Sequence, residues 1–200
     1  AWVGVKNSNH AGAGATYAMM PLEKNMVGIY LAVGSANHLP PWGGIDMLLS
    51  TNPIAIAIPS QFKPPIVLDM ATTNTSYGKV KVAASNNKNM PIGWMQDEKG
   101  NSITNPKDAD QGFLIPIGGP KGYGLALMIG ILAGSINGAA FGKNVIDFNK
   151  DFKTTTNTGH VLIALDIKSF MPYEEFINEI DKIWNVMKSS RKMEGYSNIR

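Results

Sequence analysis

Short apolar runs bounded by turn-forming residues recur along the chain. Each run is rich in β-branched or aromatic residues and is flanked by Gly, Pro, Asn or Ser, a composition typical of β-strands. We therefore predict strands at these positions: Trp2–Val5, Met26–Val33, Pro53–Pro59, Pro65–Met70 and His160–Ile167.

Two further segments have helical patterns. Pro172 precedes Glu174 and Glu175, which suit the first turn of a helix because carboxylates are stabilised there. A second helix is predicted at about Gly14–Lys24, although Pro21 favours a kink or an early end. After Pro172 the apolar residues recur at helical spacing: Phe176, Ile180, Ile183, Trp184 and Met187.

The segment from Gly122 to Gly142 contains no charged residue and is flanked by Lys121 and Lys143. Its length alone would allow a membrane-spanning helix. Its many glycines, together with Ser135 and Asn137, dilute the hydrophobicity. A buried helix that packs closely against a sheet, with glycine permitting the approach, explains the segment equally well.

The remaining long stretch, Ser85 to Asp110, is polar and rich in Asn, Lys and Asp. We interpret it as an excursion on the surface of one domain. The length of 200 residues and the 44% of hydrophobic residues suffice for one well-packed domain, alone or with an appendage.

Composition restricts the classes of function. The chain has no cysteine, which excludes disulfides and thiolate zinc sites and is consistent with a cytoplasmic protein. The net charge is +3, but the lysines are scattered, so nucleic-acid binding is not expected. The only arginines are Arg191 and Arg200, so a clamp for a substrate carboxylate is expected to be lysine or to lie outside this chain.

The three histidines differ in their surroundings. His10 follows a predicted strand and precedes a run of glycine and alanine that leaves room for a substrate, so it is the best candidate for proton transfer. His38 lies in a proline-rich loop, which favours a surface role. His160 begins an apolar strand and is expected to be a hydrogen-bonded core residue. Their spacing fits no metal motif, and no metal site is predicted.

Two glycine- or threonine-containing segments allow either a ligand or a structural role. Gly118–Gly124, "GGPKGYG", places Lys121 at a predicted helix start and is either an anion site or a flexible turn. In "VLDMATT", Asp69 ends a strand and either caps the following turn or holds a ligand. No strand–GxGxxG–helix unit occurs, so a Rossmann fingerprint is missing.

Seven segments, in order, resemble the malate/L-lactate dehydrogenase family of the non-Rossmann type. This family also contains ureidoglycolate, sulfolactate and diketogulonate dehydrogenases or reductases and piperideine-2-carboxylate reductase. The matching segments cover the chain from Trp2 to about Phe170: "VGVKNSNHAGAG", "PPWGG", "STNPIAIAIP", "PIVLDMATT", "YGKV", "GGPKGYGLALMI" and "GHVLIALD".

The resemblance implies the roles of particular residues. The histidine of "SNH" is the family's catalytic acid/base, which falls on His10. A serine in the loop before "WGG" contacts the cofactor in relatives, and Ser35 is the nearest match. The other cofactor contacts implied by the resemblance are Asp69, Met70, Ala71, Thr72, Pro120, Lys121 and Gly122.

The resemblance also implies an α/β fold with a mostly antiparallel central sheet and packed helices. It makes the segment after Lys121 a buried helix and not a membrane span. It implies a cofactor-binding domain over residues 1–168, and a C-terminal helix in 169–200 that packs with an N-terminal portion preceding Ala1. We expect the chain to be a fragment that lacks this portion and the extreme C-terminus.

The expected function is NAD- or NADP-dependent interconversion of a small 2-hydroxy acid and its 2-oxo acid, in a cytoplasmic homodimer. Reduction of a cyclic imine acid or a ureidoglycolate-type substrate is the alternative reaction. A non-catalytic nucleotide-binding fragment and a membrane-associated protein are the alternatives outside enzymology.

Overall fold

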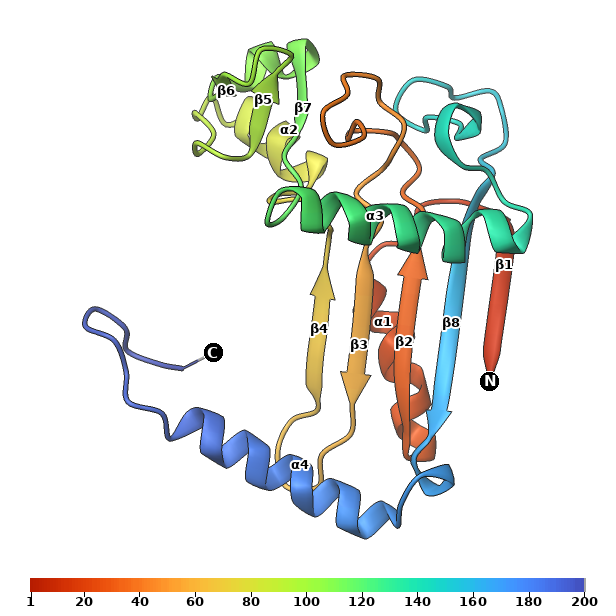
Figure 1. The fold of residues 1–200 in the computed structure, drawn as a ribbon, viewed down its shortest axis with the longest axis vertical. Helices are drawn as coiled ribbons and strands as arrows, with labels where there is room; N and C mark the ends of the chain where they lie inside the picture. Colours follow the sequence, from red (N-terminus) through yellow and green to blue (C-terminus); the bar gives the residue numbers. More distant parts are fainter. Residues whose placement is uncertain (200) are drawn as a thin grey trace.

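The computed structural model describes residues 1–199 and contains two antiparallel sheets. In the larger sheet every neighbouring pair of strands is antiparallel, unlike the parallel strands of a doubly wound sheet. The predicted strands and the predicted mostly antiparallel α/β class are therefore confirmed. In sheet order the strands are β1 (Trp2–Ser8), β8 (Thr158–Asp166), β2 (Met26–Ala32), β3 (Ile54–Ile58) and β4 (Ile66–Met70) (Figure 1).

One face of this sheet consists of small residues and is covered by helix α1 (Gly14–Met19). Ala55 and Ala57 of β3 are completely buried beneath it. A side chain at Gly28 of β2 would lie 1.9 Å from the carbonyl oxygen of Ala18, so only glycine allows this approach. The predicted early end of the helix is confirmed, since α1 stops at Met19 and a 3₁₀ helix, η1 (Met20–Lys24), which contains Pro21, follows it.

Helix α3 (Pro120–Ala133) crosses the other face of the sheet near the strand ends (Figure 1). It is shorter than the predicted helix, because the chain leaves helical geometry at Gly134 and turns at Gly138, whose φ is 68°. The predicted close packing is confirmed at Gly130, where an added Cβ would lie 2.9 Å from the side-chain nitrogen Nδ2 of Asn52, just before β3.

The prediction that this helix is buried is wrong for its outer side. Leu125 and Met128 are 37% and 51% exposed, because the helix rests on the sheet along one side only. Apolar composition does not reveal which side is covered. No helix within residues 1–199 has the length and apolar character needed to cross a membrane.

The polar stretch after Ser85 and the residues just beyond it form a small sheet that the sequence did not reveal. Its strands are β5 (Met95–Asp97), β6 (Ser102–Ile103) and β7 (Gly112–Leu114), which follow α2 (Tyr77–Ser85) and flank η2 (Pro106–Gln111). This small region has a core of its own, formed by Val80, Met90, Met95, Ile103, Ala109 and Leu114.

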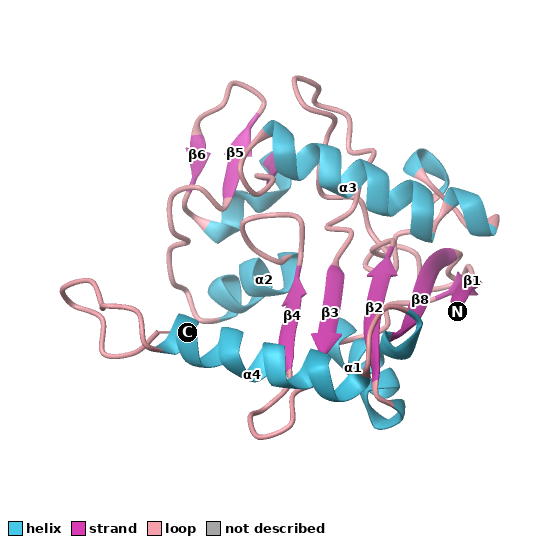
Figure 2. Cartoon of the chain, turned by 60° about the horizontal axis from the view of Figure 1, so that its bottom comes forward, coloured by secondary structure: helices cyan, strands magenta, loops and turns pink. Residues whose placement is uncertain are grey.

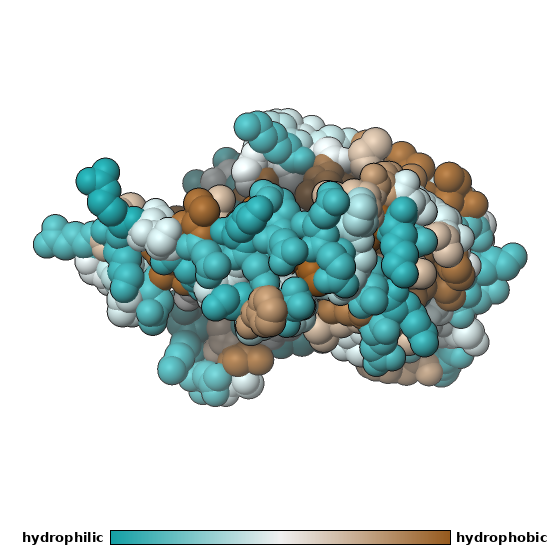
Figure 3. Space-filling view, turned by 90° about the horizontal axis from the view of Figure 1, so that it is seen from below, coloured by the Kyte–Doolittle hydropathy of each residue, from teal (hydrophilic) through white to brown (hydrophobic). Residues whose placement is uncertain are grey.

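Helix α4 (Tyr173–Lys188) confirms the predicted C-terminal helix and crosses the opposite end of the sheet from α3 (Figures 1 and 2). The buried carboxylate of Asp181 fastens it to the loop between β3 and β4 by accepting hydrogen bonds from the Ser60 hydroxyl at 2.7 Å and the Phe62 N–H at 3.3 Å. Seen from below, the molecule presents a largely hydrophilic surface across its middle (Figure 3).

Candidate active site

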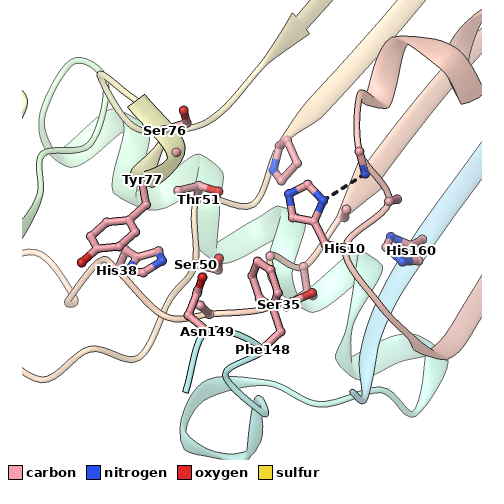
Figure 4. Close-up of a pocket in the computed structure, with 18 of the residues that line it drawn as sticks. His10, Ser35, His38, Ser50, Thr51, Ser76, Tyr77, Phe148, Asn149 and His160 are labelled. Atoms are coloured by element: carbon pink, nitrogen blue, oxygen red, sulfur yellow. Dashed lines mark hydrogen bonds between the residues drawn. The ribbon is translucent and has the colours of Figure 1, made fainter. Parts of the chain in front are cut away.

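A pocket of about 200 Å³ lies at the end of the larger sheet where β1 and β2 finish and β8 begins. Its lining combines the loop after β1, the loop after β2, the start of α2 and the loop that contains Phe148 and Asn149 (Figure 4). His10 and Ser35, two of the predicted site residues, both line it.

An irregularity in β1 directs the chain toward this pocket. The register between β1 and β8 shifts between Val5 and Ser8, and Asn7 adopts a left-handed φ of 54°. Such bulges redirect a strand end and its side chains. The Thr158 hydroxyl then donates to the Ser8 carbonyl at 2.9 Å and holds the redirected chain against β8.

The ring of His10 is held at one nitrogen. The Gly12 N–H donates to Nδ1 at 3.0 Å, a contact that requires the loop to turn at Gly12, where φ is 76°. The ring of Phe148 packs against the imidazole with 5.7 Å between ring centres. Nε2 lies on the other side of the ring and faces the residues across the pocket (Figure 4). Because Nδ1 accepts in this arrangement, the neutral ring carries its hydrogen on Nε2 and can donate it toward the pocket.

His160 lines the same pocket but is fully engaged, as predicted for a hydrogen-bonded core residue. It is 4% exposed, its Nε2 donates to the Asn9 carbonyl at 3.1 Å, and its Nδ1 accepts from the Tyr30 hydroxyl at 2.7 Å. Burial lowers the pKa of His160 and raises that of Tyr30. The neutral ring supports the loop that presents His10.

The expected surface role of His38 is wrong. Its imidazole stacks on Tyr77 with 4.0 Å between ring centres and lines the side of the pocket opposite His10 (Figure 4). Burial lowers the pKa of His38 to about 4, an effect that Asp147 opposes and the Lys81 ammonium reinforces. The proline-rich sequence around His38 did not indicate this position, because the stacking partner, Tyr77, belongs to a helix that is distant in the sequence.

The segment Asp69–Thr72 lies directly behind the pocket lining. Thr72 is completely buried, and its N–H and hydroxyl both donate to the carbonyl of Thr51, which does line the pocket. The Asp69 carboxylate accepts the N–H of Ala15 at 2.8 Å in the first turn of α1. The carboxylate thus caps a helix that precedes it by 54 residues, and not the turn that follows it as the sequence suggested. A cofactor contact at Asp69 stays a prediction.

The second predicted cofactor segment is brought next to the first. The Ile117 N–H donates to the Thr72 carbonyl at 3.0 Å, just before α3 begins at Pro120. Lys121 is exposed in the first turn of α3, and Gly122 is buried against the Ile117 backbone. These residues do not line the His10 pocket, so the predicted site residues form two adjoining groups.

Sequence reasoning missed the residues that close the pocket opposite His10. Tyr77 and Lys81 lie one helical turn apart on α2, and Asn149 reaches Lys81 from a loop far away in the chain. Ser76, which caps α2 by accepting the Lys79 N–H at 3.3 Å, was the available signal for this helix. Within residues 1–199 no group of His, Asp or Glu side chains is arranged to hold a metal ion.

The fold is an antiparallel sheet covered by helices, and a pocket at the end of this sheet is lined by histidines. The protein is therefore of the α/β class, and its pocket contains residue types suited to acid–base chemistry. The sequence model of the malate/L-lactate dehydrogenase family matches residues 1–200. The chain therefore belongs to the malate/L-lactate dehydrogenase family, as the sequence motifs indicated.

Individual relatives agree with this assignment. The chain is 37% identical to malate dehydrogenase of Pyrococcus abyssi over 98% of its length and 38% identical to malate/(S)-sulfolactate dehydrogenase of Methanothermus fervidus over 95%. The structure of malate dehydrogenase from Pyrococcus horikoshii superposes over the whole chain with a TM-score of 0.85 at 34% identity. In each case the chain spans 55% of the relative's length.

Proposed function

We propose that the protein containing this chain is an NAD- or NADP-dependent oxidoreductase that interconverts a small 2-hydroxy acid and its 2-oxo acid. The observation that carries the proposal is His10, whose ring is fixed through Nδ1 and whose Nε2 faces a pocket. Membership of a dehydrogenase family supplies the reaction class.

His10 is the proton-transferring residue in this proposal. During oxidation Nε2 takes the hydroxyl proton while the hydrogen on the adjacent carbon leaves as hydride; in reduction the ring returns a proton to the forming alkoxide. A ring that accepts a proton at Nε2 carries its other hydrogen on Nδ1. The Gly12 contact to Nδ1 therefore has to open during the reaction.

A bound nicotinamide would supply the hydride acceptor or donor. Ser35 lines the His10 pocket and is the residue that we assign to the reactive end of the cofactor. The start of α3 fits the phosphates, because first-turn N–H groups lack partners within a helix and the Lys121 side chain is exposed beside them. Asp69–Thr72 and Pro120–Gly122 are the adjoining cofactor segments in this assignment.

The finer assignments belong to the same proposal. We propose a homodimer, which the exposed apolar side of α3 supports, a cytoplasmic location, and packing of residues 169–200 against a further part of the whole protein. The alternative reaction is reduction of a cyclic imine acid or a ureidoglycolate-type substrate, and a non-catalytic nucleotide-binding role is the alternative outside catalysis.

The test uses the whole protein with NADH and NADPH against a panel of 2-oxo acids and cyclic imine acids. Replacing His10 by Ala is expected to lower kcat about 100- to 10,000-fold, the usual contribution of general acid–base catalysis. The Kd for cofactor, measured by nucleotide fluorescence, should change little. Normal turnover with weakened cofactor binding in His10→Ala would contradict the assignment, and cofactor binding without turnover of any substrate would favour a binding module.

A further inference from the structure

The segment that presents His10 is tied to the sheet by a single hydrogen bond among the described residues. Residues 9–13 connect the end of β1 to α1, and their other hydrogen bonds stay within the segment or reach the first turn of α1. The exception joins the Asn9 carbonyl to Nε2 of His160 on β8, at 3.1 Å. His160 lies beside the loop that carries His10 (Figure 4). The place of the His10 ring relative to the sheet therefore depends on His160.

The chemistry of the partners fixes the direction of this hydrogen bond. A carbonyl oxygen only accepts, so Nε2 of His160 has to carry a hydrogen. The buried ring is neutral, because burial lowers the pKa of His160, and its Nδ1 is then an acceptor. The Tyr30 hydroxyl, 2.7 Å away, supplies the donor. Donation therefore runs from Tyr30 through His160 to the Asn9 carbonyl.

Tyr30 is well fixed as the first donor of this chain. It lies on β2, is 2% exposed, and its ring stacks on Tyr17 of α1 with 4.9 Å and on His160 with 5.6 Å between ring centres. Burial also raises the pKa of Tyr30, so its hydroxyl keeps the hydrogen that it donates. Close packing of this kind holds a side chain in one rotamer. The tautomer of His160 is therefore set by contacts of the sheet and α1.

We propose that Tyr30 and His160 are positioning residues for proton transfer at His10. Tyr30 fixes the tautomer of His160, and His160 fixes the backbone at Asn9 and with it the ring of His10. This inference rests on the proposed function, because it requires His10 to transfer the proton. His160 itself exchanges no proton with a substrate, since both of its ring nitrogens are engaged. A displacement of about 1 Å can lower an enzymatic rate about 100-fold, so loss of this contact should reduce kcat.

The first experiment compares two substitutions of His160 in the whole protein, with a 2-oxo acid or cyclic imine acid that the panel shows to be turned over. The amide nitrogen of His160→Gln can still donate to the Asn9 carbonyl, whereas His160→Leu has no donor. We expect His160→Leu to lower kcat about 10- to 100-fold and to change KM and the cofactor Kd by no more than about twofold. His160→Gln should retain kcat to within about fivefold.

A control separates positioning from stability. Val161→Ala removes buried side-chain volume from the next residue of β8, which lies outside the pocket lining, so it should destabilise the protein and leave kcat nearly unchanged. Equal losses of kcat in His160→Leu and His160→Gln would overturn the proposal. So would losses of kcat that follow thermal stability across all three variants.

The second experiment tests the role of Tyr30 by nuclear magnetic resonance of isotope-labelled histidine. The His160 signals are assigned from the spectrum of His160→Gln. In wild type we expect the neutral tautomer with its hydrogen on Nε2, and slow exchange of that hydrogen with water. Tyr30→Phe keeps the ring on Tyr17 but removes the donor to Nδ1, so the other tautomer should appear and exchange should accelerate. A hydrogen on Nδ1 in wild type, or a tautomer that Tyr30→Phe leaves unchanged, would overturn the role of Tyr30.

The same spectra separate this inference from the proposed reaction, because they are recorded without substrate. The ring signals of His10 should broaden or shift in His160→Leu and stay close to those of wild type in His160→Gln. That response, without turnover of any substrate on the panel, would retain the positioning contact and reject the reaction. Turnover by wild type with an unchanged kcat in His160→Leu would retain the reaction and reject the positioning role.

Discussion

The two sides of the pocket are built in different ways. The sheet side carries His160 on β8 and His10 on the loop after β1, and α1 supports this sheet through the small residues of β2 and β3. The helix side carries His38, Tyr77 and Lys81, and it depends on a small region with a separate core. The proposed proton transfer at His10 therefore takes place on the sheet side, whereas the opposite side of the pocket rests on a core separate from that of the larger sheet.

The histidines show what this difference means. On the sheet side, His160 satisfies both ring nitrogens with near neighbours and thereby fixes the loop of His10. On the helix side, His38 is held by stacking on Tyr77, so burial sets its charge state. The three histidines therefore differ in role according to their contacts: His160 supports a loop, His38 packs against an aromatic ring, and His10 is the proposed proton-transferring residue.

Among the variants that separate the two sides, Gly28→Ala on the sheet side is expected to lower the unfolding free energy most. The new Cβ would lie 1.9 Å from the Ala18 carbonyl oxygen, so α1 must move away from the sheet. We expect a loss of at least about 3 kcal/mol in unfolding free energy, the upper end for overpacking, because the clash is with backbone, together with reduced kcat. Gly124→Ala is the control, because its Cβ meets nothing within 4 Å and alanine favours the helix by about 0.5 to 1 kcal/mol. Urea unfolding measures both, and equal midpoints would show that the support from α1 is unimportant.

A somewhat smaller change in unfolding free energy is expected on the helix side when the pH is lowered, because His38 is buried in its neutral form. The pKa of His38 is about 4 in the folded protein and near 6.5 when unfolded, so the unfolded chain takes up its proton first as the pH falls. The contribution of neutral His38 to the unfolding free energy is therefore fully present above about pH 6.5. It declines as the pH falls toward 4, by up to about 3 kcal/mol. In His38→Phe, which keeps an aromatic ring against Tyr77, urea unfolding should depend less on pH in this window. An unchanged dependence would contradict the buried neutral state.

The smallest change in unfolding free energy is expected for two threonines just before α2. The Thr73 hydroxyl donates to the Thr75 carbonyl at 2.7 Å, whereas the buried Thr75 hydroxyl has no partner among the described residues. Thr73→Val should destabilise the protein by about 1 kcal/mol, and Thr75→Val should be neutral or slightly stabilising. Thermal unfolding of the two variants shows which substitution costs more stability. A larger loss in Thr75→Val would mean that its hydroxyl binds a group such as water.

Part of the site was predictable because its signals are local. His10 stands between an apolar strand and a run of small residues, and those few positions suffice to single it out. The strands of the larger sheet and α4 were predictable for the same reason, since alternation, turn residues and helical spacing are read within one segment. Lys121 was assigned by resemblance and by its place at a helix start.

The rest depended on contacts between distant segments. His38 and Tyr77 are far apart in sequence, and Lys81 meets Asn149 only when a later loop folds over α2. The small sheet was hidden because its strands are too short to show a period of alternation. The exposed side of α3 was hidden because a glycine-rich apolar helix has no polar face to mark it.

The sequence by itself determined the positions of the strands along the chain, the place of the catalytic candidate and the family to which the chain belongs, because these depend on residue type and local spacing. Tertiary structure decided which histidine stays neutral, which lysine faces the pocket and which predicted cofactor segments lie side by side. Charge and accessibility arise from the groups that folding brings within a few ångströms, and no local pattern encodes them.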